Sequence, residues 1–151
     1  MIKRLFEFSA LSAMLIANAW AGAITVSAPT VRAMPASVPN TAGYVQLTAT
    51  EQDDALLSAR CEGITVTELH TLLMEDGMMK MRPVDAILLP HNQLIELEQG
   101  GYHLMMMGLQ RPLTIDDTVS CQLSFKLAPP QMVDFTVRRM GKPAEHHHHH
   151  H

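Results

Sequence analysis

The stretch that decides the fold is TVSCQLSFKL, from Thr118 to Leu127. Apolar and polar side chains alternate along it without a break. The apolar set, which would face one side, is Val119, Cys121, Leu123, Phe125 and Leu127. Alternation with a period of two is typical of a half-buried β-strand, whereas an amphipathic helix repeats every three or four residues. The stretch therefore predicts a strand with one face in the core.

Outward from this strand, other segments show the same alternation. The clearest are Gly43 to Thr50, Ile64 to Leu73, Gln93 to Glu98 and Met132 to Arg138, with weaker ones at Ile24 to Val31, Leu56 to Cys61 and Ile87 to Leu89. Pro, Gly, Asn and Asp separate many of them, and no long helical period appears. Short strands at this density indicate an all-β protein built as an antiparallel sandwich or barrel.

Both ends of the chain are expected to lie outside the working domain. Residues 1–21 have a basic start, an apolar run and the small-residue site Ala19-Trp20-Ala21, which together are typical of a secretory signal peptide. Residues 141–151 form a C-terminal tail that ends in the six-histidine tag. We therefore expect one domain, residues 22–140, in an exported protein.

Charge and cysteine content narrow the class of protein further. The chain has 11 basic and 15 acidic residues, and removal of Lys3, Arg4 and Glu7 with the signal peptide leaves nine against fourteen. This negative balance argues against nucleic acid or an anionic membrane surface as a partner, and we expect no membrane insertion of the mature chain. The two cysteines, Cys61 and Cys121, could form a disulfide in an oxidising compartment, could remain separate buried thiols, or could bind a metal.

A hairpin signal lies at Asp76-Gly77, the dipeptide preferred in two-residue hairpin loops. A loop of these two residues places Leu72 opposite Met81. Met81 then lies diagonal to His70 on the same face of the hairpin, within reach of a shared metal ion.

Methionine is unusually frequent between residues 74 and 107. A single methionine is usually a packing residue, and we assign Met74, Met78, Met79 and Met106 to packing. His103 and Met105, however, are two residues apart on a predicted strand, so they share a face. Neutral thioethers suit Cu(I), whereas zinc favours thiolate, imidazole and carboxylate ligands. Two imidazoles and two thioethers therefore predict a Cu(I) site.

The order His70, Met81, His103, Met105 has the spacing H-x10-M-x21-H-x-M. With the neighbouring words ELHT, MEDG, MKMRPV and GGYHLMMMGL, it resembles the PCuAC family of periplasmic copper(I) chaperones. The resemblance implies a cupredoxin-like Greek-key sandwich with these four residues as copper ligands. It also implies transfer of Cu(I) to an apo copper-accepting protein, such as a cytochrome c oxidase subunit or a Sco-type thiol protein, in copper homeostasis and oxidase assembly.

Other functions stay open at this stage. A copper storage or buffering protein would use the same site, and a non-metal binding module would use the methionines for packing alone. A blue-copper protein would need a cysteine ligand beside two histidines. We expect no enzymatic activity and no catalytic residues, because no nucleophile and base stand together and the pairs Asp53-Asp54 and Asp116-Asp117 fit turns or loops. The sequence predicts no oligomeric state.

Overall fold

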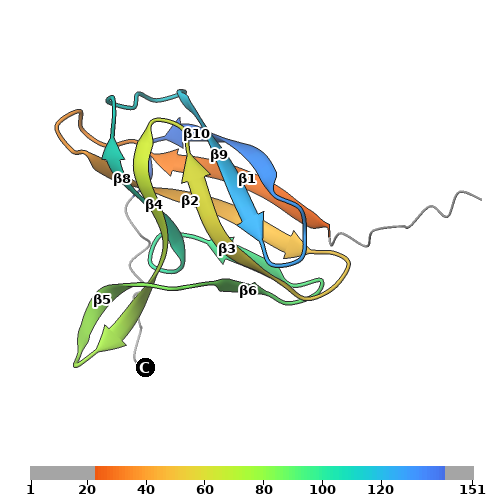
Figure 1. Cartoon of the computed structure of the whole chain (residues 1–151). Coiled ribbons are helices and arrows are strands. Elements are labelled where there is room, and N and C mark those ends of the chain that lie inside the picture. Colours follow the sequence, from red (N-terminus) through yellow and green to blue (C-terminus); the bar gives the residue numbers. More distant parts are fainter. Residues whose placement is uncertain (1–22, 142–151) are drawn as a thin grey trace, which may run out of the picture.

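The structure, a computed structural model, describes residues 23–141, which form ten β-strands (Figure 1). The strands are β1 (Ile24–Arg32), β2 (Asn40–Ala49), β3 (Asp54–Cys61), β4 (Ile64–Glu75), β5 (Met78–Pro83), β6 (Ile87–Leu89), β7 (Leu94–Leu97), β8 (His103–Leu109), β9 (Thr118–Phe125) and β10 (Gln131–Arg138). This range contains no helix that is long and apolar enough to cross a membrane. The predicted signal peptide and the histidine tag lie outside the described residues.

Strand β9 has the predicted facing. Val119, Cys121, Leu123 and Phe125 are buried, with exposed or half-buried residues between them. Leu127 is an exception, because it lies beyond the end of the strand and is exposed. The all-β class predicted from the alternation is confirmed.

The strands form one continuous hydrogen-bonded path in the order β5-β4-β8-β2-β1-β10-β9-β3-β6, and β7 also pairs with β2. Although β4 and β3 stand far apart in this order, they contact each other through the turn that joins them. The sheet thus curls around a single core, and the hydrogen-bonded path of the described domain ends at β5 on one side and β6 on the other. All pairs are antiparallel except β1 with β10, where Thr30 stands beside Thr136 in a parallel register.

The core fills the inside of the curled sheet. Its largest completely buried side chains include Phe135, Leu47, Leu56, Leu104 and Met106. Burial of each such side chain contributes about 1.5–3 kcal/mol relative to an exposed position.

A disulfide joins the two cysteines. Cys61 on β3 stands directly opposite Cys121 on β9, and their Cα atoms are 4.0 Å apart. Of the three alternatives that the sequence left open for the cysteines, the structure contains the disulfide. Neither thiol is therefore free to bind a metal.

The expectation that Asp54 is a loop residue is wrong. Asp54 begins β3 and is buried, and its carboxylate accepts hydrogen bonds from the backbone N–H groups of Ala55, Leu127 and Ala128 at 2.7–2.9 Å. Three backbone donors satisfy the buried charge and fix the segment that follows β9. This role depends on residues more than seventy positions away, so no local pattern reveals it.

Candidate metal centre

The candidate centre lies on three neighbouring strands, β5, β4 and β8. His70 on β4 stands directly opposite His103 on β8, and Leu72 stands opposite Met81 on β5, as the hairpin register predicted. Directly opposed residues share a face, as do residues two apart on one strand. His70, His103, Met81 and Met105 therefore all lie on one face of the β5-β4-β8 sheet. We call this face the donor face; Leu69 and Leu104, on the other side, belong to the core.

Both imidazole rings are buried and are oriented by hydrogen bonds. Nε2 of His70 lies 2.8 Å from the Oε2 atom of Glu68, and Nδ1 of His103 lies 3.0 Å from the backbone oxygen of Gly101. A carboxylate or a carbonyl oxygen can only accept, so these two ring nitrogens carry the proton. In a neutral ring, the other nitrogen then keeps a free lone pair.

The two remaining ring nitrogens have no partner. His70 Nδ1 and His103 Nε2 are buried without a hydrogen bond in the structure, which is unusual because buried polar atoms are normally paired. The ring centroids are 5.8 Å apart, with an angle of 59° between the rings. Metal–imidazole bonds are about 2 Å long, so this separation suits one ion held between the two rings.

Two thioethers share a surface depression with the His103 imidazole, whereas His70 does not line it. Met81, Met105 and His103 line a surface depression of about 320 Å³, together with Met34 and Leu72. Met105 is half-buried, whereas Met81 is 44% exposed. The centre thus combines a buried imidazole pair with a sulfur donor that a partner molecule can reach.

The depression offers no negatively charged donor to a hard cation. Its lining contains the Arg32 guanidinium and no carboxylate. Burial raises the pKa of Tyr44, which also lines the depression, although the positive charge of Arg32 opposes the shift, so the phenol stays neutral. Within residues 23–141 no three His, Cys, Asp or Glu side chains gather into a site for a hard cation. A metal here would be held by imidazole and thioether.

The sequence did not predict the two residues that orient the histidine rings, Glu68 and Gly101. Glu68 stands two positions before His70 and therefore on the donor face, so the period-two argument used for Met105 would have found it. The carbonyl of Gly101 carries no signal of its own in the sequence. Partners of this kind fix the tautomer of a metal-binding histidine.

The assignment of Met74, Met78 and Met79 to packing is wrong, because their exposed fractions are 65%, 60% and 53%. Met106, in contrast, is completely buried, as predicted. The three exposed methionines lie at the end of the β4–β5 hairpin, which projects from the body of the domain (Figure 1).

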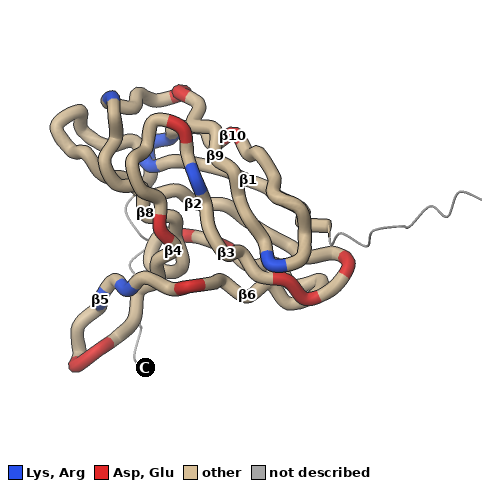
Figure 2. Tube along the Cα trace, viewed as in Figure 1, with Lys and Arg blue, Asp and Glu red and all other residues tan. Residues whose placement is uncertain are grey.

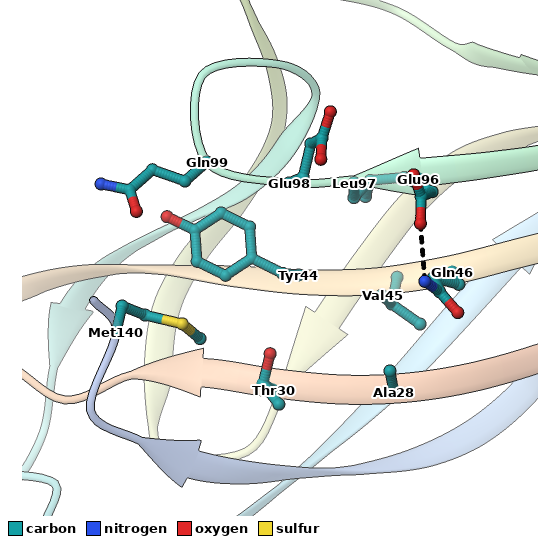
Figure 3. A pocket seen from close by; sticks show the side chains of 10 residues that line it. All are labelled: Ala28, Thr30, Tyr44, Val45, Gln46, Glu96, Leu97, Glu98, Gln99 and Met140. Atoms are coloured by element: carbon teal, nitrogen blue, oxygen red, sulfur yellow. Dashed lines mark hydrogen bonds between the residues drawn. The ribbon is translucent and has the colours of Figure 1, made fainter. Parts of the chain in front are cut away.

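A second depression, of about 250 Å³, adjoins the first and shares Tyr44 and Gln99 with it (Figure 3). Gln46 donates a hydrogen bond to Glu96 at its far end. Met140 contributes the only sulfur to its lining, and no imidazole lines it. It therefore lacks the combination of imidazole and thioethers found in the first depression.

Comparison with solved structures reveals relatives with the same fold. The apo form of DR1885 from Deinococcus radiodurans is 30% identical, with a TM-score of 0.61 over 93% of this chain and 97% of that chain. Its Cu(I) form is 32% identical, with a TM-score of 0.57 over 82% of each chain. The apo PCuAC domain of PmoF1 is 19% identical, with a TM-score of 0.66 over 78% of this chain and 94% of that chain. The cupredoxin-like fold is thereby confirmed.

A comparison with curated proteins gives no match. The LpqE-like family model, whose description reads "Putative lipoprotein LpqE-like", matches residues 24–137. This range spans every strand from β1 to β9 and all but the last residue of β10. The four-ligand motif stays a prediction, but the fold and the matched range agree: the chain belongs to the LpqE-like family and has the fold of a PCuAC domain.

Proposed function

We propose that the protein binds one Cu(I) ion through His70, Met81, His103 and Met105 and carries it outside the cytoplasm as a metallochaperone. The observation that carries the proposal is the pair of buried imidazole nitrogens without a hydrogen-bond partner, His70 Nδ1 and His103 Nε2, on neighbouring rings whose centroids are 5.8 Å apart. A buried acceptor without a partner costs about 1–3 kcal/mol, and coordination of a metal removes that cost.

The choice of copper rests on the donor chemistry and on a relative. Thioethers are soft donors that select Cu(I), and no carboxylate lines the depression to attract a hard ion. The Cu(I) form of DR1885, which is 32% identical to this chain, is a copper-bound protein of the same fold. The disulfide leaves no thiolate for a blue-copper centre, since the chain has only two cysteines.

An extracytoplasmic location fits two independent features. The family is described as lipoprotein-like, and the domain holds a disulfide, which persists in oxidising compartments. The predicted signal peptide would direct export to the periplasm. The acceptor we propose is an apo copper protein, such as the copper centre of a cytochrome c oxidase or a Sco-type thiol protein.

Exposure of Met81 favours transfer over storage. A ligand of the acceptor can approach the ion from the side where Met81 is exposed, bind it, and displace the thioether while both histidines still hold the ion. The oxidation state stays Cu(I), and no electron is transferred. Because the ion is never free in solution, this associative exchange needs no catalytic residue.

The test is a Cu(I) affinity measurement on tag-free protein by competition with a chromogenic chelator. His70→Ala and His103→Ala should each weaken binding by at least about a hundredfold, since each removes a nitrogen donor from the ion. The matched control is His91→Ala, which removes the third native histidine, exposed in the turn before β7. Equal affinities for all three variants would refute the site.

A second measurement separates transfer from storage. Cu(I)-loaded protein is mixed with candidate apo acceptors, and the copper content of each is followed after separation. Delivery to none of them, with the affinity intact, would favour a storage or buffering protein. Failure of the wild-type protein to retain copper at all would favour a non-metal binding module.

A further inference from the structure

The donor face does not end at the proposed copper site. Beyond Leu72 and Met81, the next pair along the β4–β5 hairpin is Met74 opposite Met79. Met74 is two residues from Leu72, and Met79 is two residues from Met81, so both thioethers lie on the donor face. Three methionines, Met74, Met79 and Met81, therefore extend along one face from the hairpin tip towards the buried histidines.

These methionines are exposed in a way that packing does not explain. Met74 is 65% exposed and Met79 is 53% exposed, on a hairpin that projects beyond the core (Figure 1). An exposed cluster of large apolar side chains commonly marks a functional surface. Because both side chains are mostly exposed, burial in the core does not account for them.

The opposite face of the hairpin shows what a solvated surface here looks like. Arg82 donates two hydrogen bonds to the Glu75 carboxylate, at 2.8 and 3.0 Å, and Lys80 lies 3.4 Å from it. These hydrogen bonds from Arg82 lower the pKa of Glu75, so the carboxylate stays charged. The hairpin carries acidic and basic residues close together (Figure 2). Its two faces are thus chemically distinct, one ion-paired and one rich in thioethers.

We propose that Met74 and Met79 form a second, weaker site for Cu(I), at which the ion rests on its way into or out of the histidine site. Directly opposed residues have Cβ atoms about 4.5–5.5 Å apart, so two flexible methionine side chains can bind one ion from both strands. The next donor, Met81, is two residues further along β5, about 7 Å by the rise of a strand. The ion exchanges one thioether for another at each step and remains Cu(I).

This inference rests on the proposed copper function and adds the route of the ion. Two thioethers without imidazole bind more weakly than the full site, so the hairpin pair should fill only after the histidine site. The difference in affinity between the two sites sets the direction in which the ion moves. An ion that binds to the exposed pair moves inward, because the histidine site binds it more tightly.

The first test uses protein labelled with ¹³C at the methionine methyl groups and titrated anaerobically with Cu(I), with ascorbate as the reductant. The first equivalent should shift the Met81 and Met105 signals, and the second should shift those of Met74 and Met79. The control within the same molecule is Met78, which is 60% exposed on the opposite face of the same hairpin. Equal shifts of Met78 and Met79 would overturn the proposal.

The second test measures the rate of Cu(I) transfer from loaded protein to a chelator by stopped flow. Met74→Leu combined with Met79→Leu keeps the apolar volume and removes both sulfur atoms. Transfer should slow by roughly tenfold, the effect of about 1.4 kcal/mol on the barrier. The affinity of the first equivalent should stay unchanged, and Met78→Leu should transfer at the wild-type rate.

The outcomes separate the two proposals. A double leucine variant that transfers at the wild-type rate would overturn the transit site while the copper function stands, and would leave the hairpin as an apolar docking surface. If the first equivalent shifts neither Met81 nor Met105, the histidine site itself is wrong, and the transit role with it.

Discussion

Removal of the Glu68 carboxylate is the perturbation that most directly tests how the centre is held. Oε2 of Glu68 accepts the hydrogen bond that orients the His70 ring and leaves its Nδ1 atom free. Glu68→Ala removes this bond, so the ring can rotate and its tautomer is no longer fixed. Loss of such an orienting partner typically lowers metal affinity by about 10–100-fold.

The structure places the expected effect at the low end of that range. The His70 side chain is 11% exposed, but the Glu68 side chain is 46% exposed, so water weakens the pair. A hydrogen bond to a charged group contributes about 1.5–3 kcal/mol when it is well shielded. A half-exposed one should therefore contribute about 1.4 kcal/mol, or a tenfold rise in the Kd for Cu(I).

The assay is chelator competition on tag-free protein at one pH and ionic strength. Glu68→Gln is the conservative variant, because its amide oxygen can still accept the hydrogen bond, and it should bind within about threefold of wild type. Glu51→Ala, in the turn after β2, removes one exposed carboxylate elsewhere and should have no effect. If Glu68→Ala and Glu51→Ala bind copper equally, the hydrogen bond does not position His70, and the tautomer argument fails.

Three predictions concern the scaffold. Replacement of Cys61 and Cys121 by serine should lower the free energy of unfolding in urea by about 2–4 kcal/mol, because the disulfide closes a loop of some sixty residues; an unchanged midpoint would contradict this. Gly108 and Gly63 have the same φ of 71°, but an added Cβ would contact a β4 side chain at 2.7 Å only at Gly108. Alanine should therefore cost about 1 kcal/mol at Gly63 and about 1–3 kcal/mol more at Gly108, measured by thermal unfolding, and equal costs would rule out the steric contribution. Hydrogen bonds from Thr114 and Arg111 hold the pKa of Asp117 below its ordinary value. The stability that this carboxylate contributes is therefore present above about pH 4 and is lost as the pH falls through the pKa of Asp117 in the folded protein. Unfolding curves of Asp117→Asn should accordingly show a shallower loss of stability in acid.

The local sequence pattern was sufficient to predict most of the strands and the register of the β4–β5 hairpin. The alternation from Thr118 to Phe125 gave both the strand and its buried face. Asp76 and Gly77 adopt positive φ angles of 51° and 74°, so the two-residue turn that their identity predicts fixes the pairing of the whole hairpin. In both places, the information lies within a dozen residues of chain.

The pairings between distant segments were not predictable in this way. The parallel contact of Thr30 with Thr136 and the antiparallel pairing of Cys61 with Cys121 join elements that share no local signal. Period two tells which face of a strand is buried, but it does not identify the neighbouring strand. The same limit hid the buried role of Asp54, whose partners lie after β9.

For the methionines, composition and the period of two are together not sufficient to predict which side chains are buried. Met105 and Met106 are adjacent in sequence, yet one faces the depression and the other the core, and period two separates them correctly. Met74 and Met79 follow the same alternation along their strands, but they are exposed whereas Met106 is buried. The reason is that no second layer covers the hairpin where it projects from the domain. Whether another layer of the protein covers one face of a strand depends on the whole fold, so a short segment of sequence does not predict it.

The distribution of donors suggests that affinity and transfer are controlled by different parts of the centre. The histidines are buried on β4 and β8, where hydrogen bonds fix their rings before any ion arrives, so they should set the equilibrium constant. The thioethers of Met81 and of the hairpin pair are exposed and flexible, so they should set the rate at which a partner's ligand can enter. Because the two sets occupy different parts of one face, substitutions can change one quantity and leave the other. A chaperone needs this separation, since an ion that is held tightly by a rigid cage alone would be slow to leave it.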